Sequence, residues 1–125
     1  MKNSKILIVE DEVNLRETWE LMLLHFGFSV HIAANGLEAV KIIDQHPIDI
    51  IISDIQMPVK DGYFILEHIK SNNLDILTWI CSGQLSPTST LAEYNIDKIL
   101  IKPFNMLSAV QELISIITSD DANKT

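Results

Sequence analysis

The most constraining feature of this sequence is an alternation of short apolar runs with longer segments that carry a helical period. The apolar runs predict strands at residues 5–9, 28–33, 48–53, 75–82 and 98–101. The third run, IDIIIS, is apolar almost throughout, which is typical of parallel strands covered on both faces. Strands that alternate with helices predict an α/β domain, in which a parallel sheet carries helices on both faces.

Helical periodicity fills the segments between these runs. Helices are predicted at residues 13–26, 37–45, 63–71 and 105–118, and one more follows the loop GQLSPTST. In the first helix, Trp19 and Leu23 lie on the apolar stripe, and Gly27 ends the helix. In the helix after the loop, Ser86 is the predicted N-cap and Pro87 the first helical residue. We therefore expect five strands and five helices, and right-handed crossovers leave few topologies.

Polar side chains lie at the ends of four of the five predicted strands. They are Glu10, Asp11 and Glu12 at the first strand, Asp54 at the third, Ser82 at the fourth and Lys102 at the fifth; Gly83 and Pro103 come directly after Ser82 and Lys102. In open α/β sheets, ligands bind outside the carboxyl ends of the strands. The pattern therefore predicts a ligand site that four separate strands build at one edge of the sheet.

The residue types in this set are suited to phosphoryl chemistry. Asp11 and Asp54 side by side would repel each other unless a cation lay between them, and Mg²⁺ prefers such oxygen ligands. Lys102 supplies a positive charge for an anion, and the Ser82 hydroxyl can donate to a phosphoryl oxygen. A carboxylate can also be the nucleophile and form an aspartyl phosphate, after which positioning and charge neutralisation provide most of the catalysis.

Four motifs, LIVEDE, SDIQMPVKDG, CSG and IKPF, occur in this order, each at a predicted strand end. Together they resemble the receiver domain of two-component response regulators, including the stand-alone chemotaxis type, over residues from about 4 to 118. The resemblance implies a flavodoxin-like, doubly wound (βα)5 fold with strand order 2-1-3-4-5. It implies a receiver domain at residues 1–119, followed by a polar tail at residues 120–125.

The resemblance also implies a role for each matching position. Asp54 is then the phosphoacceptor, with Ser82 and Lys102 as catalytic residues. The implied Mg²⁺ ligands are Asp11 directly, Glu10 through water, Asp54, and the backbone carbonyl of Gln56. Gln56 and Gln84 are implied to flank the phosphoryl group and to tune how fast it is lost. Pro103 would follow a cis peptide bond, and Gly62 matches the turn glycine of the family.

Two positions depart from the family pattern. The family pairs the Ser82 position with an aromatic residue three places before the lysine, and that ring moves inward on phosphorylation. Here this switch position is Ile99, which is β-branched and has no polar tip. The segment NMLSAVQELISII contains no basic residue, whereas family members that dimerise through that region often have several. We expect a monomer or a weak dimer.

Composition excludes several classes of partner. The formal net charge is −8 and the nine Lys and Arg residues are scattered, so direct binding of nucleic acid is not expected. No apolar run approaches the ~20 residues that span a bilayer, and the N-terminus does not have the pattern of a secretory signal. We expect a cytoplasmic protein without membrane insertion. Cys81 is the only cysteine, so an internal disulfide is impossible.

The resemblance implies a signalling function. A sensor histidine kinase or a phosphotransfer protein would phosphorylate Asp54 in the presence of Mg²⁺, and the phosphorelay would then switch binding of an unknown downstream protein. The only catalysis implied is of the domain's own phosphorylation and dephosphorylation, so the chain is not expected to be an enzyme in the usual sense.

Other readings stay open at this point. The chain could be a receiver cut from a longer regulator or hybrid kinase, or a fold-only interaction module with impaired switching. A magnesium-dependent phosphatase of the haloacid dehalogenase type would need a second Asp two residues after Asp54, where this sequence has Gln56. A flavodoxin-like cofactor binder would need a first loop that cradles phosphate, whereas the acids of EDE repel it.

Overall fold

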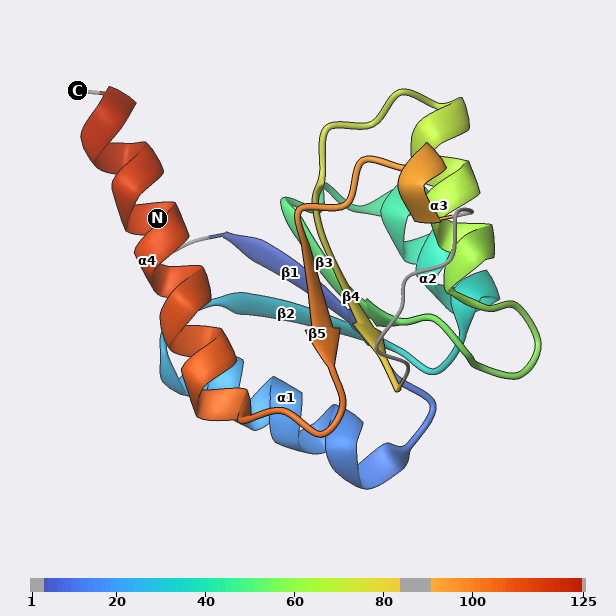
Figure 1. Ribbon diagram of the computed structural model, residues 1–125, viewed down its shortest axis with the longest axis horizontal. Coiled ribbons are helices and arrows are strands. Elements are labelled where there is room, and N and C mark those ends of the chain that lie inside the picture. The colour runs from blue at the N-terminus through green and yellow to red at the C-terminus, as the bar shows by residue number, and fades with distance from the viewer. Residues whose placement is uncertain (1–3, 84–90, 125) are drawn as a thin grey trace.

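The computed structural model describes residues 4–83 and 91–124, which form a parallel sheet flanked by helices (Figure 1). The elements are β1 (Lys5–Val9), α1 (Val13–His25), β2 (Ser29–Ala33), α2 (Gly36–Gln45), β3 (Ile50–Asp54), α3 (Gly62–Ser71), β4 (Leu77–Ser82), a short 3₁₀ helix η1 (Leu91–Glu93), β5 (Lys98–Ile101) and α4 (Met106–Lys124). Each of the five predicted strands is present, with ends that differ by up to two residues.

The five strands are all parallel and lie in the order β2-β1-β3-β4-β5, as predicted. The chain moves outward from β1 in one direction to β2 and then in the other to β3, so the strand order reverses between β1 and β3. In the register of the sheet, Val9 pairs with Ser53, and Asp54 pairs with Cys81. The carboxyl ends of these strands therefore lie at one edge, on which the predicted site residues are found.

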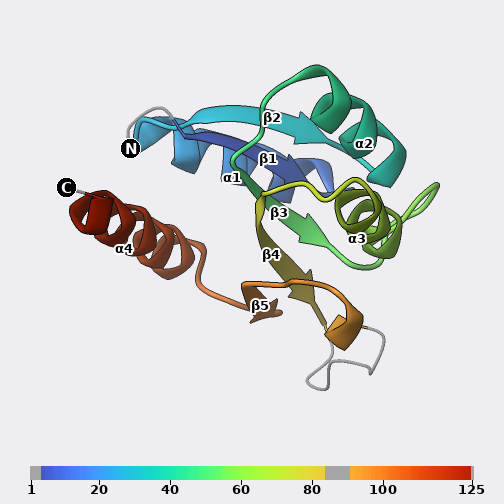
Figure 2. The ribbon, with the colours of Figure 1, turned by 90° about the horizontal axis from the view of Figure 1, so that it is seen from above.

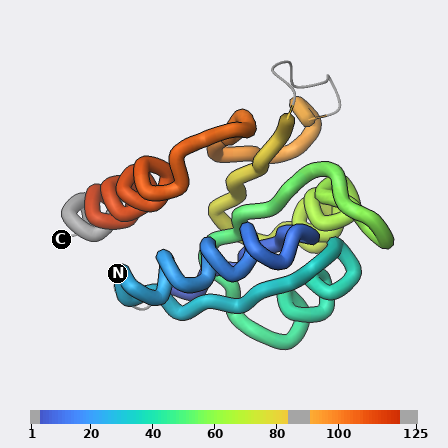
Figure 3. Tube along the Cα trace, turned by 90° about the horizontal axis from the view of Figure 1, so that it is seen from below, coloured from blue at the N-terminus to red at the C-terminus, as the bar shows by residue number. Residues whose placement is uncertain are grey.

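Helices cover both faces of the sheet (Figure 2). On one face, α1 and α4 lie side by side (Figure 3). They pack against a core that contains Trp19, Trp79 and Cys81, all buried. On the other face, α2 and α3 pack against a second core through Ala39 and Ile65. Every residue of β3 is buried, which confirms the prediction of a strand covered on both faces.

The prediction of five α-helices was wrong over the described residues, which contain four. The predicted N-cap Ser86 and the predicted first helical residue Pro87 lie outside the described residues. After them the chain makes only the 3₁₀ turn η1 and then bends into β5. At Asp97 the backbone is bonded to β4 and not to a preceding helical turn: its amide donates to the Thr78 carbonyl (2.8 Å), and its carboxylate accepts from the Thr78 amide (2.8 Å).

The last helix is longer than predicted. Asn105 caps it, because its side chain accepts a hydrogen bond from the Ser108 amide (2.9 Å). The helix then continues through Lys124 instead of ending at residue 118, because the polar residues after 118 include no Gly or Pro to stop it. None of the described helices is long and apolar enough to cross a membrane.

Candidate functional site

Asp54 is the last residue of β3 and is only 4% exposed. Its backbone is held closely: the Ser53 hydroxyl donates to the Asp54 carbonyl (2.8 Å), and the Ile55 amide donates to the Cys81 carbonyl (3.2 Å). Gly62, at the start of α3, packs directly against this backbone. A Cβ atom on Gly62 would lie 2.6 Å from the Asp54 carbonyl oxygen, so only glycine fits there. The turn glycine that the sequence predicts therefore packs against the phosphoacceptor candidate.

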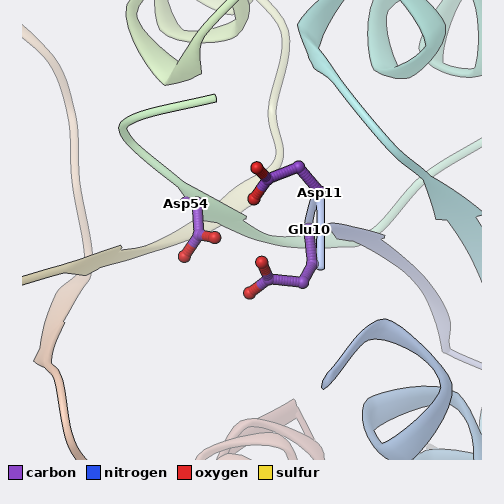
Figure 4. Close-up of side chains that lie close together, drawn as sticks. All are labelled: Glu10, Asp11 and Asp54. Atoms are coloured by element: carbon purple, nitrogen blue, oxygen red, sulfur yellow. The ribbon is translucent and has the colours of Figure 1, made fainter. Parts of the chain in front are cut away.

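Three carboxylates meet beside the end of β3 (Figure 4). Glu10 and Asp11 come from the loop after β1, and one oxygen of each lies within 4.8 Å of one oxygen of Asp54 and of the other. Glu10 is buried and Asp11 is exposed. Burial, followed by the contact with Asp54 and the charge of Asp54, raises the pKa of Glu10 to about 8, so a second negative charge beside Asp54 is unfavourable here. The set fits a hard divalent cation such as Mg²⁺, which prefers carboxylate oxygens.

Lys102 reaches the same site from the end of β5. Its Nζ lies 2.8 Å from Asp54 Oδ1 and 3.7 Å from Glu10 Oε1. The nearer contact is an ion pair at hydrogen-bonding distance, but the buried Oδ1 accepts no well-aligned hydrogen bond from the described residues. Burial alone would lower the pKa of Lys102, but the contact with Asp54 and the charge of Glu10 outweigh burial and raise it. Lys102 therefore stays charged beside Asp54.

A cavity of about 330 Å³ opens beside Asp54. Its lining comprises Asp54, Ile55, Gln56, Cys81, Ser82, Gly83 and Lys102. The Lys102 amide donates to the Ser82 carbonyl (2.8 Å), which joins β5 to β4 at this rim, and the predicted cis bond before Pro103 is present. Asp54, Gln56, Ser82 and Lys102, which the sequence placed in one site, thus line one cavity. The carboxylates of Glu10 and Asp11 lie beside that of Asp54.

Two further predicted positions are not part of this group: Ile99 lies elsewhere in the fold, and Gln84 is not described. Ile99 is half-buried in an apolar cluster on the α3 side of the sheet, with Ile55, Leu66 and Ile80. Ile55 belongs to this cluster and also lines the cavity, so it connects the two. Gln84 lies outside the described residues.

Sequence reasoning missed two residues at the site. Cys81, to which sequence reasoning assigned no role in the site, is buried in the core and also lines the cavity. Burial, reinforced by the charge of Asp54, raises the pKa of its thiol to about 12. Arg16, on the first turn of α1, donates from Nη1 to the Glu10 carbonyl (2.9 Å). The one signal for Arg16 was its place one turn after the acidic loop.

Comparison with known proteins identifies the family. The sequence model described as the response regulator receiver domain matches residues 6–117. The chain belongs to this family. A receiver domain is a signalling domain of two-component systems and not a classical enzyme. The strand order β2-β1-β3-β4-β5 is that of the flavodoxin-like α/β fold.

Curated relatives of this receiver domain are longer proteins. It is 39% identical over 101 residues to the probable transcriptional regulator ycf27 of Cyanidium caldarium, a match that covers 80% of this chain and 41% of the relative. It is 33% identical over 118 residues to the probable transcriptional regulator ycf29 of Pyropia yezoensis, a match that covers 89% of this chain and 53% of the relative. The chain thus spans about half the length of the curated relatives it matches.

Solved structures share the fold over nearly their whole length. The chemotaxis protein CheY4 of Vibrio cholerae is 26% identical and superposes with a TM-score of 0.81, covering 90% of this chain and 97% of that one. The response regulator TrrA of Thermotoga maritima, in complex with Mg²⁺ and BeF, is 28% identical with a TM-score of 0.78, covering 90% and 97%. The predicted likeness to chemotaxis-type receivers is confirmed at the level of the fold.

Proposed function

We propose that Asp54 of this receiver domain accepts a phosphoryl group from a sensor histidine kinase or a phosphotransfer protein, in a reaction that requires Mg²⁺. The observation that carries the proposal is the position of Asp54 Oδ1. This oxygen is buried and lies 2.8 Å from Lys102 Nζ, and the residue that carries it lines a cavity and has two other carboxylates beside it. A nucleophile, a fixed cation and an oxygen-rich metal site are the requirements of acyl phosphate formation.

Each residue has a defined part in the transfer. An Asp54 oxygen attacks the phosphorus, the bond from phosphorus to the donor's imidazole nitrogen breaks, and that nitrogen keeps the electron pair. Lys102 balances negative charge on the phosphoryl oxygens, and the Ser82 hydroxyl donates a hydrogen bond to one of them. Asp11, Asp54, the Gln56 carbonyl and Glu10 (through water) are the proposed holders of Mg²⁺. When bound, the cation neutralises charge on the phosphoryl oxygens.

Phosphorylation would act on the rest of the domain through packing. Ile55 adjoins Asp54 and packs in the same apolar cluster as Ile99, which supports a route from the site to the α3 side of the sheet. We propose that the Ser82 hydroxyl and this apolar cluster, with Ile99 at the position where the family has an aromatic residue, shift the domain between two packings and so change binding of a downstream protein. Gln56 and Gln84 are proposed to tune the lifetime of the phosphoryl group.

The length of the relatives favours a particular output. The curated relatives are named as probable transcriptional regulators, and this chain spans about half of them. We propose that the domain controls transcription through another segment or partner that binds DNA, because an acidic domain with net charge −8 is a poor binder of DNA phosphates. We propose that the receiver domain comprises residues 1–119. We also propose that the protein is a monomer or a weak dimer and that it is located in the cytoplasm.

Intact mass spectrometry tests the proposal directly. The protein is incubated with acetyl phosphate, with Mg²⁺ or with EDTA, beside the variants Asp54→Asn and Asp75→Asn. Asp75 is an exposed aspartate next to β4, at the opposite end of that strand from the site, and serves as the matched control. We expect one Mg²⁺-dependent phosphoryl adduct in the wild type and in D75N, and none in D54N.

Failure to see an adduct has one further check, because a short-lived acyl phosphate can escape detection. Mg²⁺-dependent binding of beryllofluoride, measured by fluorine NMR, reports on the site without turnover. A wild-type chain that shows neither an adduct nor beryllofluoride binding contradicts the proposed function and leaves the reading of a fold-only interaction module.

A further inference from the structure

The loop that supplies two of the three acids is held by a residue of the following helix. Arg16 is the fourth residue of α1 and is partly buried. Its Nη1 donates to the Glu10 carbonyl (2.9 Å), while its backbone amide donates to the Glu12 carbonyl (2.9 Å). Arg16 thus contacts the acidic loop at two backbone oxygens, one on each side of Asp11.

The contact with the Glu10 carbonyl has a geometric consequence for Asp11. The carbonyl oxygen of Glu10 lies in the same rigid peptide plane as the nitrogen and Cα of Asp11. A hydrogen bond to this oxygen therefore fixes the orientation of the peptide plane. It thereby also fixes the position of the Asp11 Cα atom, to which the exposed Asp11 side chain is attached. Asp11 needs such support more than Glu10, because Glu10 is buried and its carboxylate already accepts from the Glu12 amide (3.1 Å).

The choice of acceptor also matters. The hydrogen bond from Arg16 goes to a backbone carbonyl and occupies none of the carboxylate oxygens that a cation would use. The guanidinium keeps its charge at every accessible pH, and its planar fork holds its direction once it is partly buried. The guanidinium contact is not needed to cap α1, because the Arg16 backbone amide already makes the first helical hydrogen bond, to the Glu12 carbonyl.

We propose that Arg16 is a positioning residue for the metal site: its guanidinium orients the Glu10–Asp11 peptide so that the acids converge with Asp54 before Mg²⁺ binds. This inference rests on the proposed function and extends it to a residue on α1. Groups that orient metal ligands from outside the coordination sphere commonly change metal affinity about 10–100-fold when they are removed.

Calorimetric titration with Mg²⁺ at fixed pH tests this role. The variant Arg16→Met removes the donors and one positive charge, and Lys41→Met, on the exposed side of α2, removes one positive charge elsewhere as the matched control. We expect R16M to bind Mg²⁺ about tenfold more weakly than the wild type. K41M should bind within about twofold of the wild type, because exposed charges that are far from the site are screened.

A second readout needs no metal. In the metal-free protein, the Glu12 amide donates to the Glu10 carboxylate, so its hydrogen exchange reports on the order of the loop. We expect exchange at Glu12 to be faster in R16M than in K41M, with equal exchange in the core of β3. Thermal unfolding establishes that both variants fold. If R16M does not fold, Arg16→Gln replaces it, because Gln keeps high helix propensity in a shorter side chain.

The outcomes separate the two proposals. Equal Mg²⁺ affinity in the Arg16 variant and K41M, when the wild type binds Mg²⁺, overturns the role of Arg16 and leaves the proposed function intact. A wild-type chain that binds no Mg²⁺ overturns the proposed function, and the inference about Arg16 with it.

Discussion

The Nζ atom of Lys102 lies 2.8 Å from Oδ1 of Asp54, and this ion pair joins the ends of β5 and β3 across the intervening strand β4. Asp54 is buried, while Lys102 keeps about a third of its side-chain surface exposed. A buried carboxylate without a partner is unfavourable, so the ion pair with Lys102 offsets part of the cost of burying Asp54. The pair therefore couples the electrostatics of the metal-free site to its proposed chemistry.

Replacing Lys102 tests this coupling. We expect Lys102→Met to slow formation of the phosphoryl adduct from acetyl phosphate about 100-fold, because a fixed cation that stabilises developing charge is lost. Lys98→Met is the matched control: it removes a lysine from the same strand whose partner is the partly exposed Glu112 (2.7 Å). K98M should react within about threefold of the wild type. Equal rates for the two variants would contradict a role for Lys102 in the transfer.

Gly62 offers a test of the packing beneath Asp54. A Cβ atom at residue 62 would lie 2.6 Å from the Asp54 carbonyl oxygen and 2.8 Å from Cα of Ile55, and backbone atoms cannot move aside cheaply. We expect Gly62→Ala to lower the free energy of unfolding in urea by about 3 kcal/mol. Gly83→Ala is the control, because a Cβ there would meet nothing within 4 Å. Similar losses in both variants would show that the close contact at Gly62 is not limiting.

Val59 occupies a strained backbone conformation in the loop between β3 and α3. Its φ is 73°, which is unfavourable for a β-branched side chain, and the side chain is 68% exposed, so it contributes little packing. We expect Val59→Gly to raise the free energy of unfolding by roughly 0.5–1 kcal/mol. Glycine relieves the backbone strain of the folded state, and this gain exceeds the stability that is lost because glycine gives the unfolded chain more conformational entropy.

The control for Val59 is Asn73→Gly at another residue with positive φ (52°). Asn tolerates this conformation, so the change should be close to neutral. Both variants are compared by the midpoint of urea unfolding. A loss of stability in V59G would mean that Val59 makes a contribution that outweighs its strain.

The thiol of Cys81 should be unreactive in the native protein. Burial, followed by the charge of Asp54, raises its pKa to about 12, so the thiolate is scarce at pH 8.5. We expect iodoacetamide to alkylate Cys81 at this pH at least about 100-fold more slowly in buffer than in guanidinium, where the thiol returns to its ordinary pKa. Mass spectrometry follows the adduct. Rapid alkylation under native conditions would show that the cavity exposes the sulfur more than its buried position indicates.

Much of the site was predictable because of a general property of parallel sheets. The carboxyl ends of the strands meet at one edge, so Asp54 and Lys102 could be placed together from their positions after two apolar runs. The same argument brought Asp11 next to Asp54. Such predictions need the direction of the strands, which the alternation of apolar runs and helical periods indicates, and their order, which the family resemblance implied.

The predictions that failed depended on contacts between residues far apart in the chain. Over its described part, the helix expected after residue 83 is a 3₁₀ turn, and Asp97 then bonds to Thr78 on the neighbouring strand. The hydrogen bond from Arg16 to the Glu10 carbonyl depends on how the loop after β1 turns, which no periodicity records. These features follow from the path of loops in three dimensions.

The sequence by itself therefore determined the α/β class and the set of residues that meet at the edge of the sheet, because both follow from local hydrophobic patterns and from the geometry of parallel strands. Its resemblance to the receiver family implied the strand order. Only the tertiary structure decided how closely Gly62 packs on Asp54, which oxygen Lys102 contacts, and what Arg16 holds. The physical reason is that such contacts depend on sub-ångström differences in backbone path, and many combinations of side chains are compatible with the same pattern of apolar and polar residues.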